Sequence, residues 1–348
     1  MVLADLGARV IKVEAPGRGD DARAIGPFVD GQSAYFASLN RGKESVALDL
    51  KAEGDRAVFE ALLARADVLV ENFRPGVMAR LGYSWEALHA RFSRLVMASV
   101  SGFGQTGPYA ERPAYDVVVQ GMGGIMSLTG HPDGKPTRVG TSTGDITAGL
   151  FTAIGIQAAL LERERGGEAR HVDVSMLDSQ VATLENAIAR YEATGAVPGP
   201  LGSRHPSIAP FQALATRDGY VIVAAGNDGL FSGLCAAIGR PELAEDARFA
   251  SNDLRTRNVD ALAAELESAL ATRSTGEWLA VFEKAGIPSG PINDVADVLA
   301  DPQVRARNMI VTAGGLSLAG NPIKLSGVRD PDTRSPAPTL DQNRPDLP

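Results

Sequence analysis

Short apolar runs alternate with amphipathic segments along the first half of the chain. Runs rich in β-branched residues and bounded by turn residues predict strands, and apolar positions three or four apart predict helices. This alternation predicts an α/β fold in which a parallel sheet carries helices on both faces. The predicted strands are residues 8–14, 45–50, 67–73, 94–100 and 170–175. The predicted helices are about 53–65, 78–81, 84–89 and 178–193.

The pattern changes at residues 194–206, a Pro/Gly-rich stretch that predicts a linker. Beyond it, two apolar strand patterns flank Asp218-Gly219, which is a hairpin signal. Three amphipathic helices are predicted after the hairpin, near 229–238, 260–272 and 275–285. A hairpin followed by helices is typical of a smaller α+β domain. The second Pro/Gly-rich stretch, 287–293, predicts another hinge.

The length of 348 residues suggests two domains, and the change of pattern places their boundaries. From Asn308 on, a short strand and many prolines are expected to return to the first domain or to a partner subunit. The predicted organisation is a large domain at 1–195 completed by 305–348, a linker at 196–210, a small domain at 211–290 and a return linker at 291–304. Residues 1–7 resemble the end of a helix stopped by Gly7, so we expect an earlier segment to be lacking before Met1.

The stretch from Gly140 to Gly149 carries the main chemical candidate, Asp145, into an apolar segment at 150–161 that predicts a helix. An aspartate in front of a helix is most often an N-cap, because its oxygens accept hydrogen bonds from the free N–H groups of the first turn. The same N–H groups and the helix dipole also favour an ionised carboxylate. Asp145 is therefore either a cap or a nucleophile beside a glycine-containing loop.

Composition narrows the function classes. The chain has 34 Lys and Arg against 42 Asp and Glu, a net charge of −8, which argues against nucleic-acid binding but leaves room for a local phosphate site. The single cysteine, Cys235, lies in an apolar helical pattern and is expected to pack in a core. The four histidines lack metal-ligand spacing, so no metal is expected. No signal peptide or membrane-spanning run is recognised, which favours a cytoplasmic enzyme or binding protein.

Three further patterns have both structural and functional interpretations. The segment Gly102 to Gly107 fits G-x-G-x-x-G, but the prolines after it predict a loop, so a turn that lines a ligand crevice is favoured over a dinucleotide site. The glycines within 118–126 indicate close helix packing. Three basic residues follow predicted strands, and together they can hold phosphates: Lys51, Arg74 and Arg80.

Several motifs, in order, resemble those of the class III CoA-transferases, the family of formyl-CoA:oxalate transferase and carnitine CoA-transferase. The matching stretches are residues 5–14, 40–43, 48–51, 70–82, 101–109, 112–116, 144–145, 172–176 and 285–291. They cover nearly the whole chain. The resemblance implies a Rossmann-like large domain, a small domain, and two subunits that interlock as a homodimer.

The resemblance also implies that Asp145 is the catalytic nucleophile. It would attack the thioester of an acyl-CoA donor to give an aspartyl anhydride, and the CoA thiolate would return to form an aspartyl-CoA thioester that the acceptor carboxylate opens. Small dicarboxylic or hydroxy acids are the expected acids, and coenzyme A is the expected substrate group.

The family's CoA contacts fall here on Leu48, Lys51, Asn72, Phe73, Arg80 and Tyr115. Asp116 matches an acidic position near the nucleophile. Residue 15, basic in the formyl-CoA enzyme, is Ala15, and the glycine-run lid of that enzyme is absent. Arg204 and His205 are candidates to bind the acid substrate in its place.

Two other functions stay open from the sequence. An α-methylacyl-CoA racemase-like enzyme would share the fold, but it needs an acid–base pair beside the thioester rather than one nucleophile. A non-catalytic acyl-CoA-binding protein is the alternative from another class, because the segment expected before Met1 would carry part of the pocket.

Overall fold

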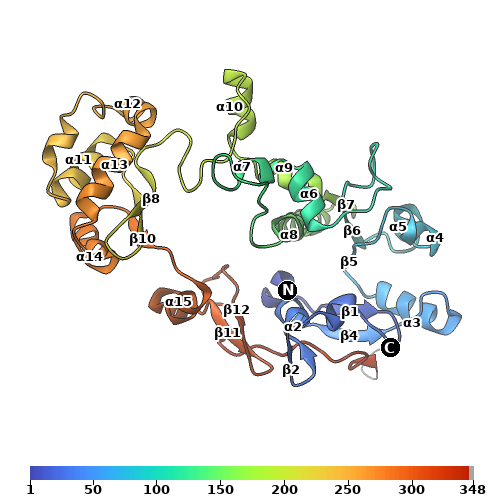
Figure 1. Ribbon diagram of the computed structural model, residues 1–348. Coiled ribbons are helices and arrows are strands. Elements are labelled where there is room, and N and C mark those ends of the chain that lie inside the picture. Colours follow the sequence, from blue (N-terminus) through green and yellow to red (C-terminus); the bar gives the residue numbers. More distant parts are fainter. Residues whose placement is uncertain (345–348) are drawn as a thin grey trace. The chain divides into compact units, whose positions relative to one another are not determined.

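The computed structural model describes residues 1–344, which group into two compact units (Figure 1). Unit 1 contains Met1–Ile125, Val139–Glu185 and the chain from Val298 on, and unit 2 contains Met126–Arg138 and Asn186–Asp297. The predicted completion of the large domain by 305–348 extends past Arg344, the last described residue.

Unit 1 contains two parallel sheets where the sequence predicts one. In the first, β1 (Ile11–Glu14) pairs with β4 (Glu44–Ala47). In the second, β6 (Val96–Ser101) lies between β5 (Val68–Glu71) and β7 (His171–Ser175). All the predicted strands of this region therefore form, and all pair in parallel. Unit 1 also contains two separate antiparallel strand pairs: β2 (Phe28–Val29) with β3 (Gln32–Ser33), and β11 (Ile310–Ala313) with β12 (Leu316–Ala319).

The helices of unit 1 include the predicted ones at 53–65, 78–81 and 84–89, and the predicted helical segment 150–161 lies within α8 (Thr143–Glu164). In chain order the helices of this unit are α1 (Val2–Asp5), the 3₁₀ turn η1 (Asp21–Ala24), α2 (Ala34–Asn40), α3 (Glu53–Leu63), α4 (Val77–Arg80), α5 (Trp85–Arg91), α6 (Asp116–Met122), α8, α9 (Met176–Ala182) and α16 (Pro302–Ala306). Two short helices, α7 (Ile125–Leu128) and α15 (Val295–Ala300), lie where the chain passes between units. The longest helix, α8, packs against β6, β7, α6 and α9. Its Gly155 permits this approach, because a Cβ there would lie 2.7 Å from Val172 Cγ1.

The predicted helix 178–193 is wrong as one helix. The chain forms α9 and then α10 (Ala187–Thr194), and Glu185 between them has a positive φ of 53°. A non-glycine residue in this region cannot continue a right-handed helix. The break also marks a unit boundary, since Glu185 is the last residue of the middle segment of unit 1.

The C-terminal chain of unit 1 packs against its N-terminal sheet. Asn343 Oδ1 accepts from Ser45 N at 3.0 Å, and Asp341 Oδ1 accepts from Ala47 N at 2.7 Å. These side chains satisfy backbone N–H groups of β4 that would otherwise need water or another strand.

Unit 2 is built on an antiparallel sheet with helices beside it. The strand order is β10 (Ser289–Pro291), β9 (Tyr220–Ala224), β8 (Phe211–Ala215), which confirms the predicted hairpin. The helices are α10, α11 (Asp228–Ala237), the 3₁₀ turn η2 (Pro241–Ala244), α12 (Asn252–Arg257), α13 (Val259–Leu270) and α14 (Thr275–Ala285). The predicted hinge at 287–293 instead contains β10. Its proline is tolerated because β10 is the edge strand.

The unit boundaries differ from the predicted domain boundaries because residues 126–138 join unit 2. There, Gly202 N donates to Gly130 O at 2.8 Å, which ties this early segment to the stretch predicted as a linker. The helix α10, predicted as part of the large domain, also belongs to unit 2.

Replacing Arg255 with methionine should lower the free energy of unfolding of unit 2 by about 3 kcal/mol, because three backbone carbonyls would lose a charged donor. Arg255 is fully buried, and its guanidinium donates to the carbonyls of Ala209, Phe249 and Gly226 at 2.7–3.0 Å. Urea unfolding followed through the buried Trp278 measures the loss.

The matched control is Arg257→Met two residues later. Arg257 has a side chain 72% exposed and pairs with Asp253 at the surface, so its loss should change the free energy by about 0.5 kcal/mol or less. Equal effects of the two substitutions would contradict the role of Arg255.

Candidate active site

Asp145 lies at the third position of α8, inside the helix rather than in front of it. Ser142 is the N-cap residue, and its side chain makes no capping hydrogen bond. The helix starts at Thr143 because the loop before it ends in short polar residues and the apolar periodicity begins at Ile146. Asp145 therefore does not act as the N-cap that its position in the sequence favoured.

The Asp145 carboxylate makes no hydrogen bond or ion pair with any part of the chain that the structure describes. Solvent reaches this side chain, yet the surrounding protein partly desolvates it. This burial raises the pKa of Asp145, and the charge of Asp116 raises it further. A carboxylate without a partner and with a raised pKa is a better nucleophile than one held by donors.

Asp116 contributes more than charge, because it supplies the hydrogen bond that Ser142 does not. Asp116 is 8% exposed, at the start of α6, and its Oδ1 accepts from Gly144 N at 2.9 Å. One unpaired N–H of the first turn of α8 is thus satisfied by a carboxylate from a neighbouring helix. That donor is consequently occupied by Asp116 and does not contribute to the ionised state of Asp145 that the sequence predicts for N–H groups at a helix start.

Gln120 lies one turn after Asp116 on α6 and is fully buried. Its Nε2 donates to Asp116 Oδ2 at 2.8 Å and to Thr141 O at 3.1 Å, while its Oε1 accepts from Val139 N at 2.9 Å. The glycines of this stretch indicate helix packing, and the sequence pattern alone does not single out Gln120. The detectable signal was its i, i+4 spacing from Asp116 on a predicted helix.

Gly144 allows α6 and α8 to approach closely beside Asp145. A Cβ at this position would lie 2.6 Å from Val119 Cγ2 and 3.1 Å from Asp116 Oδ1. We expect Gly144→Ala to displace the first turn of α8 and to lower kcat about 100-fold, because small displacements of a reacting group have effects of this size.

Gly149→Ala in the same helix is the control for this substitution. Its added Cβ would meet nothing within 4 Å, so activity should be kept and the helix slightly stabilised. Steady-state kinetics of both variants test the close approach, and equal activities would contradict it.

The residues predicted to bind CoA all lie in unit 1. Leu48 is 3% exposed and belongs to the hydrophobic core between β4, α3 and α4, so its side chain is not open to a ligand. Phe73 and Tyr115 are 47% and 80% exposed, as expected of aromatic side chains that receive a ligand. Asn72 Nδ2 donates to Val100 O at 2.6 Å and so links the ends of β5 and β6.

Lys51, Arg74 and Arg80 are exposed and follow the strands as predicted. Lys51 lies between β4 and α3, and Arg80 is the last residue of α4. Their assignment to phosphates stays a prediction.

The glycine segment 102–107 forms a loop after β6, and no helix begins before α6. Gln105 N donates to Asp173 Oδ2 at 3.0 Å, and Gly104 N donates to Ser101 Oγ at 3.0 Å. A Cβ on Gly102 would lie 2.3 Å from the Cβ of Ala114. A dinucleotide site would require a helix to begin at this segment, and the structure forms a loop there, so the dinucleotide interpretation is wrong.

Arg204 and His205 lie in unit 2. Arg204 pairs with Asp260 at 2.8 Å, and His205 Nδ1 accepts from Ser207 N at 3.1 Å. Both side chains thus have partners within unit 2, and their role toward an acid substrate stays a prediction.

Cysteine and histidine chemistry adds nothing to this site. Cys235 is fully buried, as predicted, and burial raises the pKa of its thiol to about 11. His171 Nε2 lies 2.9 Å from Ser99 Oγ between strands β6 and β7, where it packs on Trp85. Over residues 1–344 no three His, Cys, Asp or Glu side chains are grouped as metal ligands.

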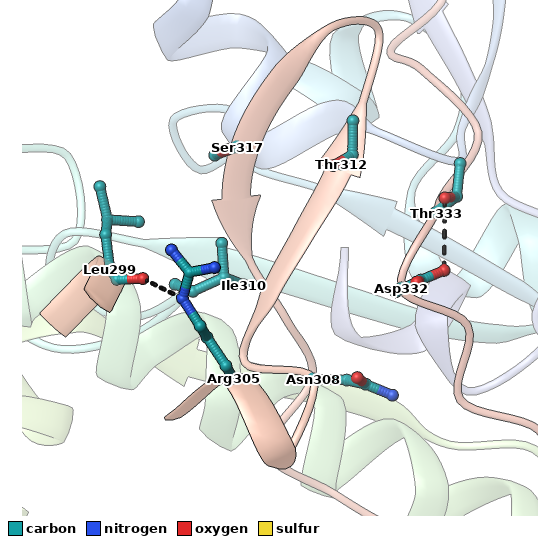
Figure 2. A pocket seen from close by; sticks show the side chains of 8 residues that line it. All are labelled: Leu299, Arg305, Asn308, Ile310, Thr312, Ser317, Asp332 and Thr333. Atoms are coloured by element: carbon teal, nitrogen blue, oxygen red, sulfur yellow. Dashed lines mark hydrogen bonds between the residues drawn. The ribbon is translucent and has the colours of Figure 1, made fainter. Parts of the chain in front are cut away.

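A pocket of about 450 Å³ lies elsewhere in unit 1, along β11 and the chain after β12 (Figure 2). Its lining residues are Leu299, Arg305, Asn308, Ile310, Thr312, Ser317, Asp332 and Thr333. Arg305 Nε donates to Leu299 O at 2.7 Å, a bond that is dashed in Figure 2. None of these residues is a predicted site residue, so the pocket and the nucleophile are separate features.

α8 exposes a row of apolar side chains after Asp145. Ile146, Leu150 and Ile154 are 50%, 46% and 61% exposed, and they recur at i, i+4 and i+8 on one helix face. The helix as a whole is also long and apolar enough to cross a membrane, which corrects the prediction that no segment has this character. Core helices share that length and composition, so it is weak evidence for a membrane.

The chain matches a known protein family and several characterised proteins. The family CoA-transferase family III matches residues 1–344. The chain is 53% identical to an acetyl-CoA:oxalate CoA-transferase of Acetobacter aceti, over 98% of this chain and 88% of that protein. It is 41% identical to a succinate–glutarate CoA-transferase of Agrobacterium fabrum, over 97% and 85% of the two chains.

Solved structures agree with this result. A CAIB/BAIF family protein from Brucella suis superimposes with a TM-score of 0.86 at 44% identity, covering 98% of this chain and 91% of that one. A hypothetical protein from Mycobacterium tuberculosis gives a TM-score of 0.89 at 34% identity, covering 99% and 93%. The mixed α/β fold with parallel sheets is thus shared with these proteins, and the chain belongs to CoA-transferase family III.

Proposed function

We propose that this enzyme transfers CoA from an acyl-CoA donor to a short dicarboxylate, with Asp145 as the nucleophile. The observation that carries the proposal is the Asp145 carboxylate itself. It has no partner among residues 1–344, and it has a raised pKa at the start of α8. The side chain is open to solvent, so a thioester can reach it, and no cation or N–H donor of the described chain competes for its oxygens.

The choice of acceptor rests on the relatives. Those named above act on oxalate and on glutarate, according to their names, and others at 37–38% identity act on mesaconate and citramalate. All four acids are dicarboxylates. Oxalate is the first acceptor to test, because the oxalate enzyme shares 53% of its residues with this chain.

The reaction follows from carboxylate chemistry. An Asp145 oxygen attacks the carbonyl carbon of the donor thioester. The C–S bond breaks, the CoA thiolate departs, and an aspartyl–acyl anhydride is formed. The thiolate then attacks the Asp145 carbonyl, which releases the donor acid and leaves an aspartyl-CoA thioester. The acceptor carboxylate attacks this thioester, and its C–S bond breaks to release the CoA thiolate and form a second anhydride. The thiolate then attacks the acceptor carbonyl carbon, which forms the acceptor's CoA thioester and releases Asp145 as a carboxylate.

CoA itself is assigned to the exposed ends of the unit 1 strands. Lys51 and Arg80 carry the positive charge that phosphates need, and Phe73 and Tyr115 offer exposed rings to the adenine or pantetheine. Asn72, next to Phe73 in the sequence, is bonded to Val100 O near the end of β6. The core position of Leu48 leaves its backbone as the contacting group.

A homodimer is part of the proposal. Exposure of the apolar row of α8 to water is unfavourable, and we propose that a second subunit covers this row, which lies on the helix whose first turn contains Asp145. We propose that the enzyme is located in the cytoplasm, where its CoA ester substrates are present.

Mass spectrometry after a short incubation with acetyl-CoA or succinyl-CoA tests the nucleophile. The expected result is a CoA-sized adduct on the peptide that carries Asp145, removed by hydroxylamine and absent from Asp145→Ala. An adduct on another residue, or none with any donor, would refute the covalent mechanism.

A further inference from the structure

Gln120 is the most completely bonded polar side chain beside the proposed nucleophile. It is fully buried, and its amide makes three hydrogen bonds, to Asp116, Thr141 and Val139. The orientation of this amide is fixed by its partners. The N–H of Val139 can only donate and the carbonyl of Thr141 can only accept, so the oxygen and nitrogen of Gln120 cannot be exchanged.

These bonds connect Gln120 to the two parts of the structure that hold the start of α8: the loop before the helix, and Asp116. Val139 and Thr141 lie in the loop that leads into α8, on either side of Gly140. Asp116 Oδ2 accepts from Gln120, and Asp116 Oδ1 accepts from the backbone N–H of Gly144, the residue directly before Asp145. One side chain therefore fixes the path of the loop and the direction of the carboxylate that bonds to the helix start.

We propose that Gln120 is a positioning residue for the nucleophile: its amide holds the 139–141 loop and Asp116 together, so that Asp145 is presented at one place at the start of α8. Gln120 does not touch the substrate in this proposal. It acts through Asp116 and the loop, and the inference rests on the proposed role of Asp145. Fully satisfied buried networks of this kind favour one arrangement over others, since each alternative leaves a buried polar group unpaired.

Glutamate distinguishes positioning from packing. Gln120→Glu keeps the size and the acceptor for Val139, but when ionised it turns an oxygen toward Asp116 Oδ2 and Thr141 O, which are both acceptors. A buried glutamate beside a carboxylate takes up a proton as the pH falls, and the protonated acid can donate again. The defect of Gln120→Glu should therefore shrink at low pH.

The experiment measures the rate of Asp145 adduct formation for wild type and variants between about pH 8 and pH 5.5, together with thermal unfolding at each pH. We expect Gln120→Glu to be slower than wild type by about 100-fold at the upper pH, and the ratio to fall by about tenfold or more at the lower pH. Gln120→Met, which has no titrating group, should give a ratio that does not change with pH. Gln212→Glu is the control, since Gln212 is 8% exposed on β8 in unit 2 and should leave the ratio near one.

The outcomes separate the two proposals. Absence of an adduct in wild type overturns the nucleophile and with it the role of Gln120. A wild-type adduct, with a Gln120→Glu rate within about threefold of it or a ratio independent of pH, overturns the positioning role alone. If Gln120→Glu does not fold at the upper pH, the uncharged Gln120→Met carries the comparison of rates, and a wild-type rate in that variant also overturns the proposal.

Discussion

Replacing Asp145 with asparagine should lower kcat for CoA transfer by about 10⁴-fold or more, the size of effect seen when a covalent nucleophile is removed. Asparagine keeps the size of the side chain but cannot form the anhydride or the thioester. Turnover from acetyl-CoA to oxalate measures the loss. Asp253→Asn, an exposed aspartate in the first turn of α12, is the matched control and should retain wild-type turnover.

Asp145→Asn should not destabilise the protein, so a loss of activity in this variant can be distinguished from a loss of folded protein. Because the pKa of Asp145 is raised on folding, the ionised carboxylate costs stability above that pKa. Asp145→Asn should therefore melt at an equal or higher temperature at neutral pH. The gain should vanish as the pH falls below the pKa of an ordinary aspartate, where the carboxyl is protonated in both states. A lower melting temperature with full turnover would contradict both assignments.

Periodicity predicted the elements well because burial decides them locally. The strand at 170–175 was predicted from its apolar residues, and β7 forms at His171–Ser175. The predicted helix at 53–65 forms as Glu53–Leu63, with Phe59 and Leu63 in the core. Failures occurred where backbone geometry or strand pairing decides. The positive φ of Glu185 splits one predicted helix, and an edge position turns a predicted hinge into β10.

The candidate nucleophile could be located from the sequence, but the structure that supports it could not. A glycine-containing stretch before an apolar helix marked Asp145. The bond from Gly144 to Asp116 joins residues 28 positions apart, and no local rule predicts which carboxylate will meet which helix start. The alternative that Asp145 is an N-cap failed for the same reason, since a partner from α6 supplies the hydrogen bond.

Replacing Asp116 with alanine should lower kcat by about 1000-fold, the second-largest loss that we expect. Asp116 accepts from Gly144 N and from one N–H of Gln120 Nε2, and these two buried N–H groups would lose that partner, while the other N–H of Nε2 keeps its bond to Thr141 O. Each unpaired N–H group costs about 2 kcal/mol, so the free-energy cost is about 4 kcal/mol. If this cost raises the activation free energy, kcat falls by about three powers of ten. Steady-state turnover measures it, with Asp253→Asn again as the control.

The pH profile shows whether Asp116 also acts through its charge. The Asp116 carboxylate contributes to the raised pKa of Asp145, so its removal lowers that pKa. The nucleophile is the ionised form, and the rate falls as the pH drops through the pKa of Asp145. The acid limb of adduct formation in Asp116→Ala should therefore lie at lower pH than in wild type, although the rate at its plateau is reduced. A slower variant whose acid limb does not move would show that Asp116 only holds Gly144. A limb that moves to higher pH would contradict the electrostatic role, because removing a negative charge beside Asp145 lowers the pKa of Asp145.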